Sequence, residues 1–181
     1  MRIKKTMYLL YIGLCILAIQ CVSTEQKITE RQTTSRNYYS SGMDWIKNNN
    51  YDNAITDFNN AIELDPRYVP ALIARGYAWS YKQNYDMAIS DFTSAIAINQ
   101  DSYTAFYYRA VSWNKKGERD KAIADYTMAI KLNPRYSDAY YNRGFIWFKI
   151  GEFDKAILDY DKAIELNPLD ADAFFLRASC L

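Results

Sequence analysis

The sequence predicts an all-α protein, a superhelical stack (solenoid) of helical hairpins. The main observation is a repeat with a period of about 34 residues that starts near residue 35. A fixed period of this length indicates stacked units, none of which can bury its apolar face alone. Four full units, 35–68, 69–102, 103–136 and 137–170, are followed by a partial fifth unit at 171–181.

Columns of identical residues support this period. A shift by one period aligns all the tryptophans of the chain: Trp45, Trp79, Trp113 and Trp147. It also aligns Asp52/Asp86/Asp120/Asp154, Ala54/Ala88/Ala122/Ala156, Asp57/Asp91/Asp125/Asp159 and Ala61/Ala95/Ala129/Ala163. Since contacts in such a stack are mainly local, the length of the chain says little about a central core.

Residues 1–23 have the layout of a secretory signal, with a basic start followed by an apolar run over 7–19. This run is shorter than the roughly 20 residues that cross a bilayer. Residues 17–21 resemble a bacterial lipoprotein signal, which implies lipidation of Cys21, although Gln20 stands where that family has a small residue. The alternatives are ordinary cleavage after Ser23 and an uncleaved membrane anchor.

We therefore expect export to the bacterial cell envelope, either to the periplasm or as a membrane-tethered lipoprotein, with secretion after cleavage as the alternative. Residues 24–34 are polar and lack apolar periodicity. This segment is predicted to be a linker that tethers the repeats to the membrane or to the cleavage site.

Each unit divides into two helices. In the fourth unit the first helix is predicted over about 138–150, and Gly151 supplies the left-handed residue that ends it. The second helix is predicted to start at Asp154, whose carboxylate caps free N–H groups, and to stop at Pro168. The second unit has Gln100 in place of this proline, which predicts that its second helix either runs on slightly or ends less sharply.

Corresponding turn positions in the other units hold Asn49, Gln83–Asn84 and Gly117. The fourth unit carries the motif that identifies a family. It resembles the tetratricopeptide repeat in its residues Tyr140, Gly144, Trp147, Ala156, Tyr160, Ala163 and Pro168. The resemblance implies a right-handed superhelix of antiparallel helix pairs, whose first helices line a concave groove that holds peptides or partner proteins.

An arginine column predicts contacts between neighbouring units. Each arginine follows an aspartate of the preceding unit at a constant separation: Asp57 and Arg75, Asp91 and Arg109, Asp125 and Arg143, Asp159 and Arg177. The first unit has Ser41 at this position and no preceding unit. We expect an Asp–Arg pair that sets the register between neighbours.

The sequence offers no catalytic or metal-binding motif. It contains no histidine, which is the commonest general base and metal ligand. The paired aspartates recur in every unit, as scaffold residues do. We therefore expect no enzyme activity, no cofactor and no metal. Without the three basic residues near the N-terminus the net charge is −2, a poor match to nucleic acid.

If the family geometry holds, a second face of each first helix lines the groove. The residues on this face are Tyr39, Met43, Ile46 and Lys47; Ile73, Tyr77, Ser80 and Tyr81; Tyr107, Val111, Asn114 and Lys115; and Tyr141, Phe145, Phe148 and Lys149. Such a groove is aromatic, with lysines along one edge that favour an acidic or C-terminal carboxylate group. The other interpretation is that these aromatic residues pack one helix on the next.

One subset of the family binds acidic chaperone tails through Lys, Asn and Arg at the first two groove positions. Here those positions hold Tyr, Met, Ile and Val, so this activity is not implied. The predicted function is a non-catalytic scaffold that binds a protein or peptide in the groove. The alternatives are a structural array that self-associates through the C-terminal helix, near Phe175 and Cys180, and the regulatory part of a larger protein.

Overall fold

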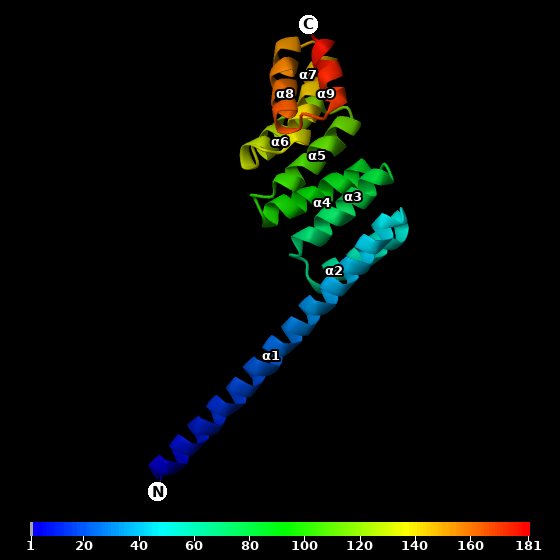
Figure 1. The fold of residues 1–181 in the computed structure, drawn as a ribbon. Coiled ribbons are helices and arrows are strands. Elements are labelled where there is room, and N and C mark those ends of the chain that lie inside the picture. Colours follow the sequence, from blue (N-terminus) through cyan, green and yellow to red (C-terminus); the bar gives the residue numbers. More distant parts are fainter. Residues whose placement is uncertain (1) are drawn as a thin grey trace.

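The computed structural model describes residues 2–181, with side chains described for 24–181. These residues form helices only, which stack in chain order, and α1 projects from the stack as a long rod (Figure 1). The helices are α1 (Arg2–Lys47), α2 (Tyr51–Leu64), α3 (Val69–Tyr81), α4 (Tyr85–Ile98), α5 (Tyr103–Lys115), α6 (Arg119–Leu132), α7 (Ser137–Lys149), α8 (Phe153–Leu166) and α9 (Ala171–Ala178). The predicted all-α solenoid is confirmed.

The helices pair as hairpins: α1 with α2, α3 with α4, α5 with α6 and α7 with α8. We call the first helix of each pair the A helix and the second the B helix, and α9 is an A helix without a B helix in the described chain. Each B helix also packs on the next A helix, and α3 contacts both α1 and α5. The A helices α1, α3 and α5 therefore lie side by side.

Left-handed residues end the A helices, as predicted. Gly117 and Gly151 have φ of 85° and 84°, and Asn49 and Gln83 have φ of 55° and 60°. A left-handed residue at this point reverses the chain within a few residues. The same backbone turn thus forms with glycine in two units and with an amide residue in the other two.

The B helices begin in two ways. The side chains of Asn50 and Asn84 accept hydrogen bonds from backbone N–H groups at the starts of α2 and α4. In α8 the capping position is Glu152, which makes no side-chain cap, and the helix begins at Phe153. The predicted cap by Asp154 is therefore wrong. Asp154 lies in the first turn, where its charge still favours the helix dipole.

An Asx turn follows the B helices α2, α4 and α6, whereas α8 ends at Leu166, just before Pro168 as predicted. Oδ1 of Asp65, Asn99 and Asn133 accepts a hydrogen bond from the backbone N–H two residues later, at 3.1, 3.1 and 3.2 Å. This hydrogen bond can end the helix even where no proline follows. Helix α4 consequently ends at Ile98 with the same 14 residues as the other B helices, and the longer helix, one of the two outcomes expected from Gln100, is wrong.

One aromatic ring at the centre of each hairpin is completely or almost completely buried: Phe58, Phe92, Tyr126 and Tyr160. Each ring lies against a small residue of the facing A helix. A Cβ added to Gly76 would lie only 2.7 Å from Cε1 of Phe92, so the two backbones approach closely because glycine is there. Burial raises the pKa of the Tyr126 and Tyr160 phenols.

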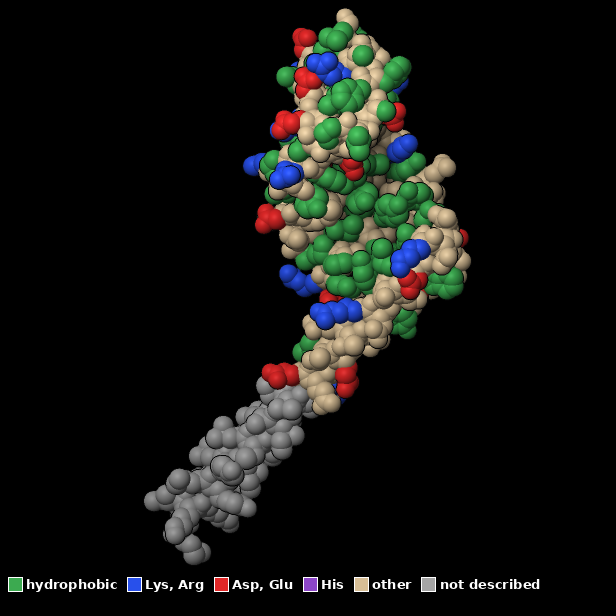
Figure 2. Space-filling model, viewed as in Figure 1, with side chains coloured by type: hydrophobic (Ala, Val, Ile, Leu, Met, Phe, Trp, Pro, Cys, Tyr) green, Lys and Arg blue, Asp and Glu red, His purple; other side chains and the backbone are tan. Residues whose placement is uncertain are grey.

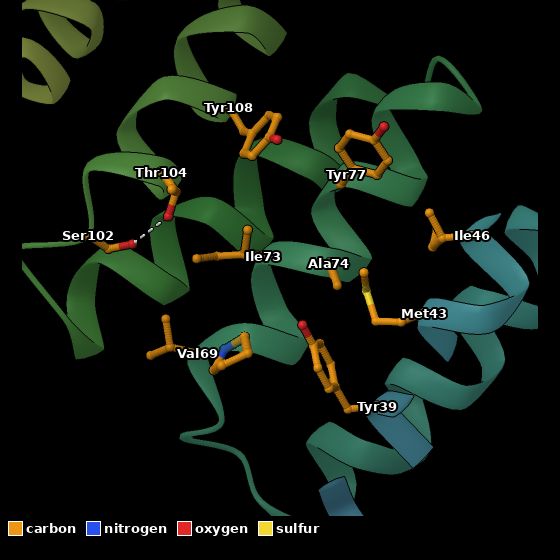
Figure 3. Close-up of a pocket in the computed structure, with 11 residues that line it drawn as sticks. Tyr39, Met43, Ile46, Val69, Ile73, Ala74, Tyr77, Ser102, Thr104 and Tyr108 are labelled. Carbon is orange, nitrogen blue, oxygen red and sulfur yellow. Dashed lines mark hydrogen bonds between the residues drawn. The ribbon is translucent and has the colours of Figure 1, made fainter. Parts of the chain in front are cut away.

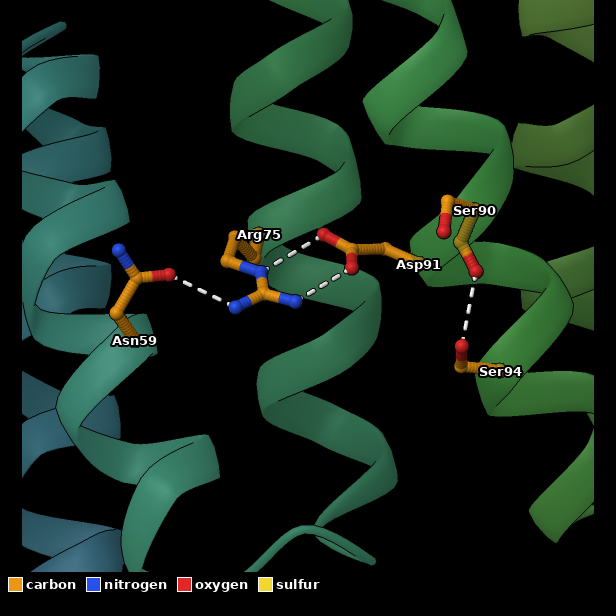
Figure 4. Close-up of polar contacts among 5 residues, drawn as sticks. All are labelled: Asn59, Arg75, Ser90, Asp91 and Ser94. Carbon is orange, nitrogen blue, oxygen red and sulfur yellow. Dashed lines mark hydrogen bonds and ion pairs between the residues drawn. The ribbon is translucent and has the colours of Figure 1, made fainter.

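The arginine column does not pair as predicted. Arg75 donates from Nε and Nη2 to the two carboxylate oxygens of Asp91, at 2.9 and 2.6 Å (Figure 4). Asp91 belongs to the B helix of the same hairpin, whereas Asp57 was the expected partner. Asp57 instead accepts a hydrogen bond from Ser41 at 2.6 Å. The predicted Asp–Arg pair between units is therefore wrong for these helices.

The other hairpins repeat this arrangement. The equivalent fork pairs are Arg109 with Asp125 and Arg143 with Asp159. The third guanidinium nitrogen reaches the preceding unit through a neutral acceptor: Nη1 of Arg75 donates to Asn59 at 2.8 Å, and those of Arg109 and Arg143 donate to Thr93 and Thr127. In the partial fifth unit, Arg177 pairs with Asp161 rather than Asp159.

The fork pair is partly shielded from water. Side-chain exposure is 19% for Arg75 and 5% for Asp91. Burial raises the pKa of the Asp91 carboxyl, although the Arg75 guanidinium acts in the opposite direction. Desolvation therefore offsets much of the ionic attraction, and the main effect of the pair is to fix helix geometry.

Residues 24–34, predicted as a linker, belong to α1 and continue directly into the A helix of the first unit. No glycine or proline interrupts them. The hydroxyls of Thr29, Thr33 and Thr34 donate to the carbonyls four residues earlier, at 2.8 to 2.9 Å. The signal segment 1–23 and the lipidation of Cys21 concern residues whose side chains lie outside the described part. Among the described residues, no helix has a stretch long and apolar enough to span a bilayer.

Alanine substitutions of Arg109 and its two candidate partners test the pairing. Because Arg109 and Asp125 share two hydrogen bonds, their double variant should show a coupling energy of about 1–3 kcal/mol in urea denaturation. Arg109→Ala and Asp91→Ala should add to within about 0.5 kcal/mol. Coupling in the second pair and additivity in the first would restore the pairing between units.

Alkaline pH should destabilise the stack. Because the folded-state pKa of Tyr126 is raised, the unfolded chain ionises first, and the stabilisation present below about pH 10 is lost as pH rises. One such group contributes a slope of up to about 1.4 kcal/mol per pH unit. Tyr126→Phe should flatten the decline in urea midpoint between pH 8 and 11. The exposed control Tyr38→Phe should not flatten it. Equal slopes of urea midpoint against pH in the unsubstituted protein and both variants would contradict this account.

Candidate functional site

An apolar cavity of about 560 Å³ opens between the A helices α1, α3 and α5. Hydrophobic side chains gather over this part of the surface, with charged side chains around it (Figure 2). The lining residues are Tyr39, Met43, Ile46, Val69, Pro70, Ile73, Ala74, Tyr77, Ser102, Thr104 and Tyr108. None of them carries a formal charge.

Helical spacing explains why these side chains meet. Tyr39, Met43 and Ile46 follow one another on α1 at intervals of four and three residues, and so lie on one face. Ile73 and Tyr77 are similarly spaced on α3. Figure 3 shows the side chains from the two helices converging on a common space, which α5 closes from the third side.

The aromatic walls of the cavity are held by further rings. Tyr39 lies 6.0 Å from the buried ring of Phe58 and meets Tyr68 edge-on at 5.4 Å. Tyr77 meets Tyr108 edge-on at 5.5 Å, and Tyr108 stacks at 5.9 Å on Phe92, a second buried ring. The cavity walls are thus anchored in the hairpin cores, which preorganises the site.

One rim of the cavity carries hydroxyl groups. Ser102 caps the start of α5 by accepting from the backbone N–H of Ala105, and its hydroxyl lies 3.2 Å from that of Thr104 (Figure 3). Aromatic rings with a few hydroxyl groups can hold apolar side chains and orient the backbone that carries them.

The structure brings together five residues of the predicted groove face: Tyr39, Met43, Ile46, Ile73 and Tyr77. All come from the first two units. Tyr81 lies outside the cavity lining, 55% exposed, with its ring stacked at 4.9 Å on Tyr51.

Two predicted groove residues of the third unit pack between helices. Val111 and Tyr107 pack against the core cluster around Tyr126. The Tyr107 ring lies 4.8 Å from Tyr136, and its hydroxyl accepts a hydrogen bond from Asn142 at 3.1 Å. Burial raises the pKa of the Tyr107 phenol. These contacts favour the packing interpretation for this unit.

The remaining predicted residues lie near the ends of their helices or in the fourth unit. Lys47 forms an ion pair with Asp44 at 2.7 Å. The Lys149 ammonium lies 5.2 and 5.9 Å from the rings of Phe145 and Phe148. Other contacts of this face are Tyr141 with the buried Tyr160, at 6.0 Å, and Ser80 with Ser112, at 3.1 Å. Lys115 has no ion pair within residues 24–181, and Asn114 and Lys115 do not line the cavity.

Sequence reasoning missed several lining residues, namely Val69, Pro70, Ala74, Ser102, Thr104 and Tyr108. Tyr108 is the most informative of them, because the other full units hold Ser40, Ala74 and Asn142 at this position. A single aromatic residue in a column of small and polar ones was the available signal for a feature specific to this unit.

Three segments of the chain match family models. Residues 36–68 and 137–169 match models described as Tetratricopeptide repeat, and residues 114–151 match a model described as TPR repeat. No curated protein gives a significant match to the chain. Across the described side chains there is also no cluster of three or more residues suited to hold a metal ion.

Several solved structures share the fold. MamA protein is 27% identical with a TM-score of 0.74, and the match covers 81% of this chain and 80% of MamA. YrrB, described as a TPR protein with an unusual peptide-binding site, is 22% identical with a TM-score of 0.70, over 86% and 80%. The first TPR of Spaghetti (RPAP3), solved with the HSP90 peptide SRMEEVD, is 24% identical with a TM-score of 0.61, over 64% and 92%.

Alanine substitutions should separate packing residues from exposed ones. Tyr107→Ala should lower the free energy of unfolding by about 2–4 kcal/mol, because it removes ring contacts and leaves a cavity. Tyr81→Ala should cost less than about 1 kcal/mol, since most of that side chain is in water. Urea denaturation measures both values, and similar losses in the two variants would contradict the assignment.

Proposed function

This chain is a tetratricopeptide-repeat protein, and we propose that it is a non-catalytic scaffold that binds a peptide or protein partner in the groove of its A helices. The observation that carries the proposal is the apolar cavity between α1, α3 and α5. Its volume of about 560 Å³ lies within the usual range of ligand sites, roughly 300–1,000 Å³.

The aromatic composition of the cavity suits peptide binding. Tyr39, Tyr77 and Tyr108 combine rigid apolar area with a hydroxyl tip, so they can bury an apolar side chain and bond to a peptide backbone. Tyrosines contribute strongly to binding energy at interfaces. Since their rings are braced by Phe58 and Phe92, little conformational entropy is lost on binding.

Peptide binding by structural neighbours agrees with this function but does not identify the ligand of this chain. YrrB is described as having a peptide-binding site, and Spaghetti is seen with an HSP90 peptide. In this chain the corresponding groove positions hold Tyr39, Ile73 and Tyr107 instead of the polar clamp that acidic chaperone tails require. We therefore propose a peptide that inserts an apolar side chain into the cavity, and not the acidic chaperone tail.

We also propose that the protein is exported and held at the bacterial cell envelope. The proposal rests on the basic and apolar pattern of residues 1–23. Lipidation at Cys21 and cleavage after Ser23 are distinct outcomes. The mass of the mature N-terminus discriminates between them, and a full-length, unmodified chain would favour an uncleaved anchor.

A structural role by self-association is the second candidate. Phe175 on α9 is 70% exposed and Phe174 on the same helix is 49% exposed, which is unusual for large apolar residues. Sedimentation of the purified array separates the two functions. A monomer supports groove binding, and an oligomer that Phe175→Glu dissociates supports assembly.

Substitutions inside the cavity test groove binding. Binders are first selected from a library of nine-residue synthetic peptides and measured by calorimetry. Tyr77→Ala and Met43→Glu should each weaken binding at least tenfold, because one removes a wall and the other puts a charge into an apolar site.

The matched control is Tyr85→Ala, which removes a tyrosine from α4, a helix that does not line the cavity. It should leave binding within about twofold, since ordinary surface substitutions have small effects. Full affinity in Met43→Glu with intact helix content would exclude the cavity as the binding site.

A further inference from the structure

One position of the repeat recurs along the cavity, and the charge of the residue at this position changes from positive in the first unit to negative in the fourth. The residues at this position are Arg36, Pro70, Thr104 and Asp138, each one period after the last, and Asp172 continues the series in the fifth unit. Pro70 and Thr104 line the cavity. Because the units stack in chain order, Arg36 on α1 and Asp138 on α7 lie in the units on either side of Pro70 and Thr104.

Arg36 marks the end of the cavity at the first unit. It lies on α1 three residues before Tyr39, and so on the same face of the helix. Its positive charge acts on Tyr68, whose ring packs edge-on against Tyr39. The side chain is exposed and forms no ion pair with the rest of the described chain.

Asp138 marks the other end. It lies in the first turn of α7, and its backbone carbonyl accepts a hydrogen bond from Asn142, which also donates to the hydroxyl of Tyr107 on α5. Its negative charge acts on Tyr107 and on Tyr108, the cavity residue. The carboxylate is exposed, and no ion pair with it occurs among residues 24–181.

We propose that the groove selects an extended peptide segment that carries an acidic residue at one end, apolar side chains in the middle and a basic residue at the other end. The acidic end faces Arg36, the apolar side chains enter the cavity and the basic end faces Asp138. This proposal rests on the proposed groove function and specifies the chemistry of its ligand.

The length of the segment follows from the helix spacing. Packed helices lie roughly 8–10 Å apart, so the three steps from α1 to α7 span roughly 24–30 Å. An extended chain rises about 3.3 Å per residue, which corresponds to about seven to nine residues. The charge pattern also fixes the orientation of the ligand, because the reverse placement brings like charges together at both ends.

Three synthetic peptides of nine residues test the proposal. They share a Gly-Phe-Leu-Phe-Gly centre, carry two charged residues at each end, and have acetylated and amidated termini. One has Glu at one end and Lys at the other, one has Glu at both ends, and one has Lys at both ends. Calorimetry at low salt should show that the mixed peptide binds about two- to fivefold tighter than each of the others, as exposed ion pairs allow.

Charge reversal should change this preference in a defined order. Arg36→Glu should make the Lys peptide the tightest ligand, and Asp138→Lys should do the same for the Glu peptide. The double variant Arg36→Glu/Asp138→Lys should restore the preference for the mixed peptide, bound in the opposite direction. High salt should remove the preferences, because it screens exposed charges.

The matched controls Lys131→Glu and Asp120→Lys reverse charges on α6, which contributes no residue to the cavity, and should leave the order unchanged. Equal binding of all three peptides to the native protein would overturn the charge pattern and leave groove binding intact. A preference that the double variant fails to restore would also overturn it. Failure of every peptide to bind would count against the groove function itself.

Discussion

The contact on which the rest of the structure depends is the packing of one aromatic ring against one small residue in each hairpin. Phe58, Phe92, Tyr126 and Tyr160 can be buried only because the facing helix carries glycine or alanine at the point of approach. This close approach brings the arginine of the A helix within reach of the aspartate of its own B helix. The same rings support Tyr39 and Tyr108, so the cavity depends on the hairpin core that lies behind it.

The fork pair and the aromatic packing have different roles. Burial of rings and alanines supplies the favourable free energy, whereas the largely buried Arg–Asp pair recovers little beyond its desolvation cost. The guanidinium uses two nitrogens within the hairpin and its third on the preceding unit, at Asn59 in the first case. One side chain thus fixes both the geometry inside a unit and the register between units, which favours a stack with a single curvature.

The period, the hairpins and the left-handed turns could be predicted from the sequence, because each repeats in every unit. The arginine partner could not, because every arginine has one aspartate before it and, in the full units, another after it at a similar separation. Only the hairpin geometry selects Asp91 for Arg75. The cavity was predicted in part: Tyr39, Met43 and Tyr77 follow helical spacing, whereas Pro70, Ser102 and Tyr108 depend on how neighbouring units rotate, which a single unit does not encode.

The continuity of α1 has a consequence for how the binding surface is presented. A flexible linker would let the array tumble freely about its attachment point, but residues 24–47 form one helix that is also the first wall of the cavity. Because α1 is one continuous helix, it fixes both the distance and the rotation of the array relative to the N-terminal end of the helix. An attachment at the N-terminal end of α1 would also set the direction in which the groove faces. A ligand that approaches from the opposite side would meet the outer faces of the B helices instead of Tyr39 and Met43.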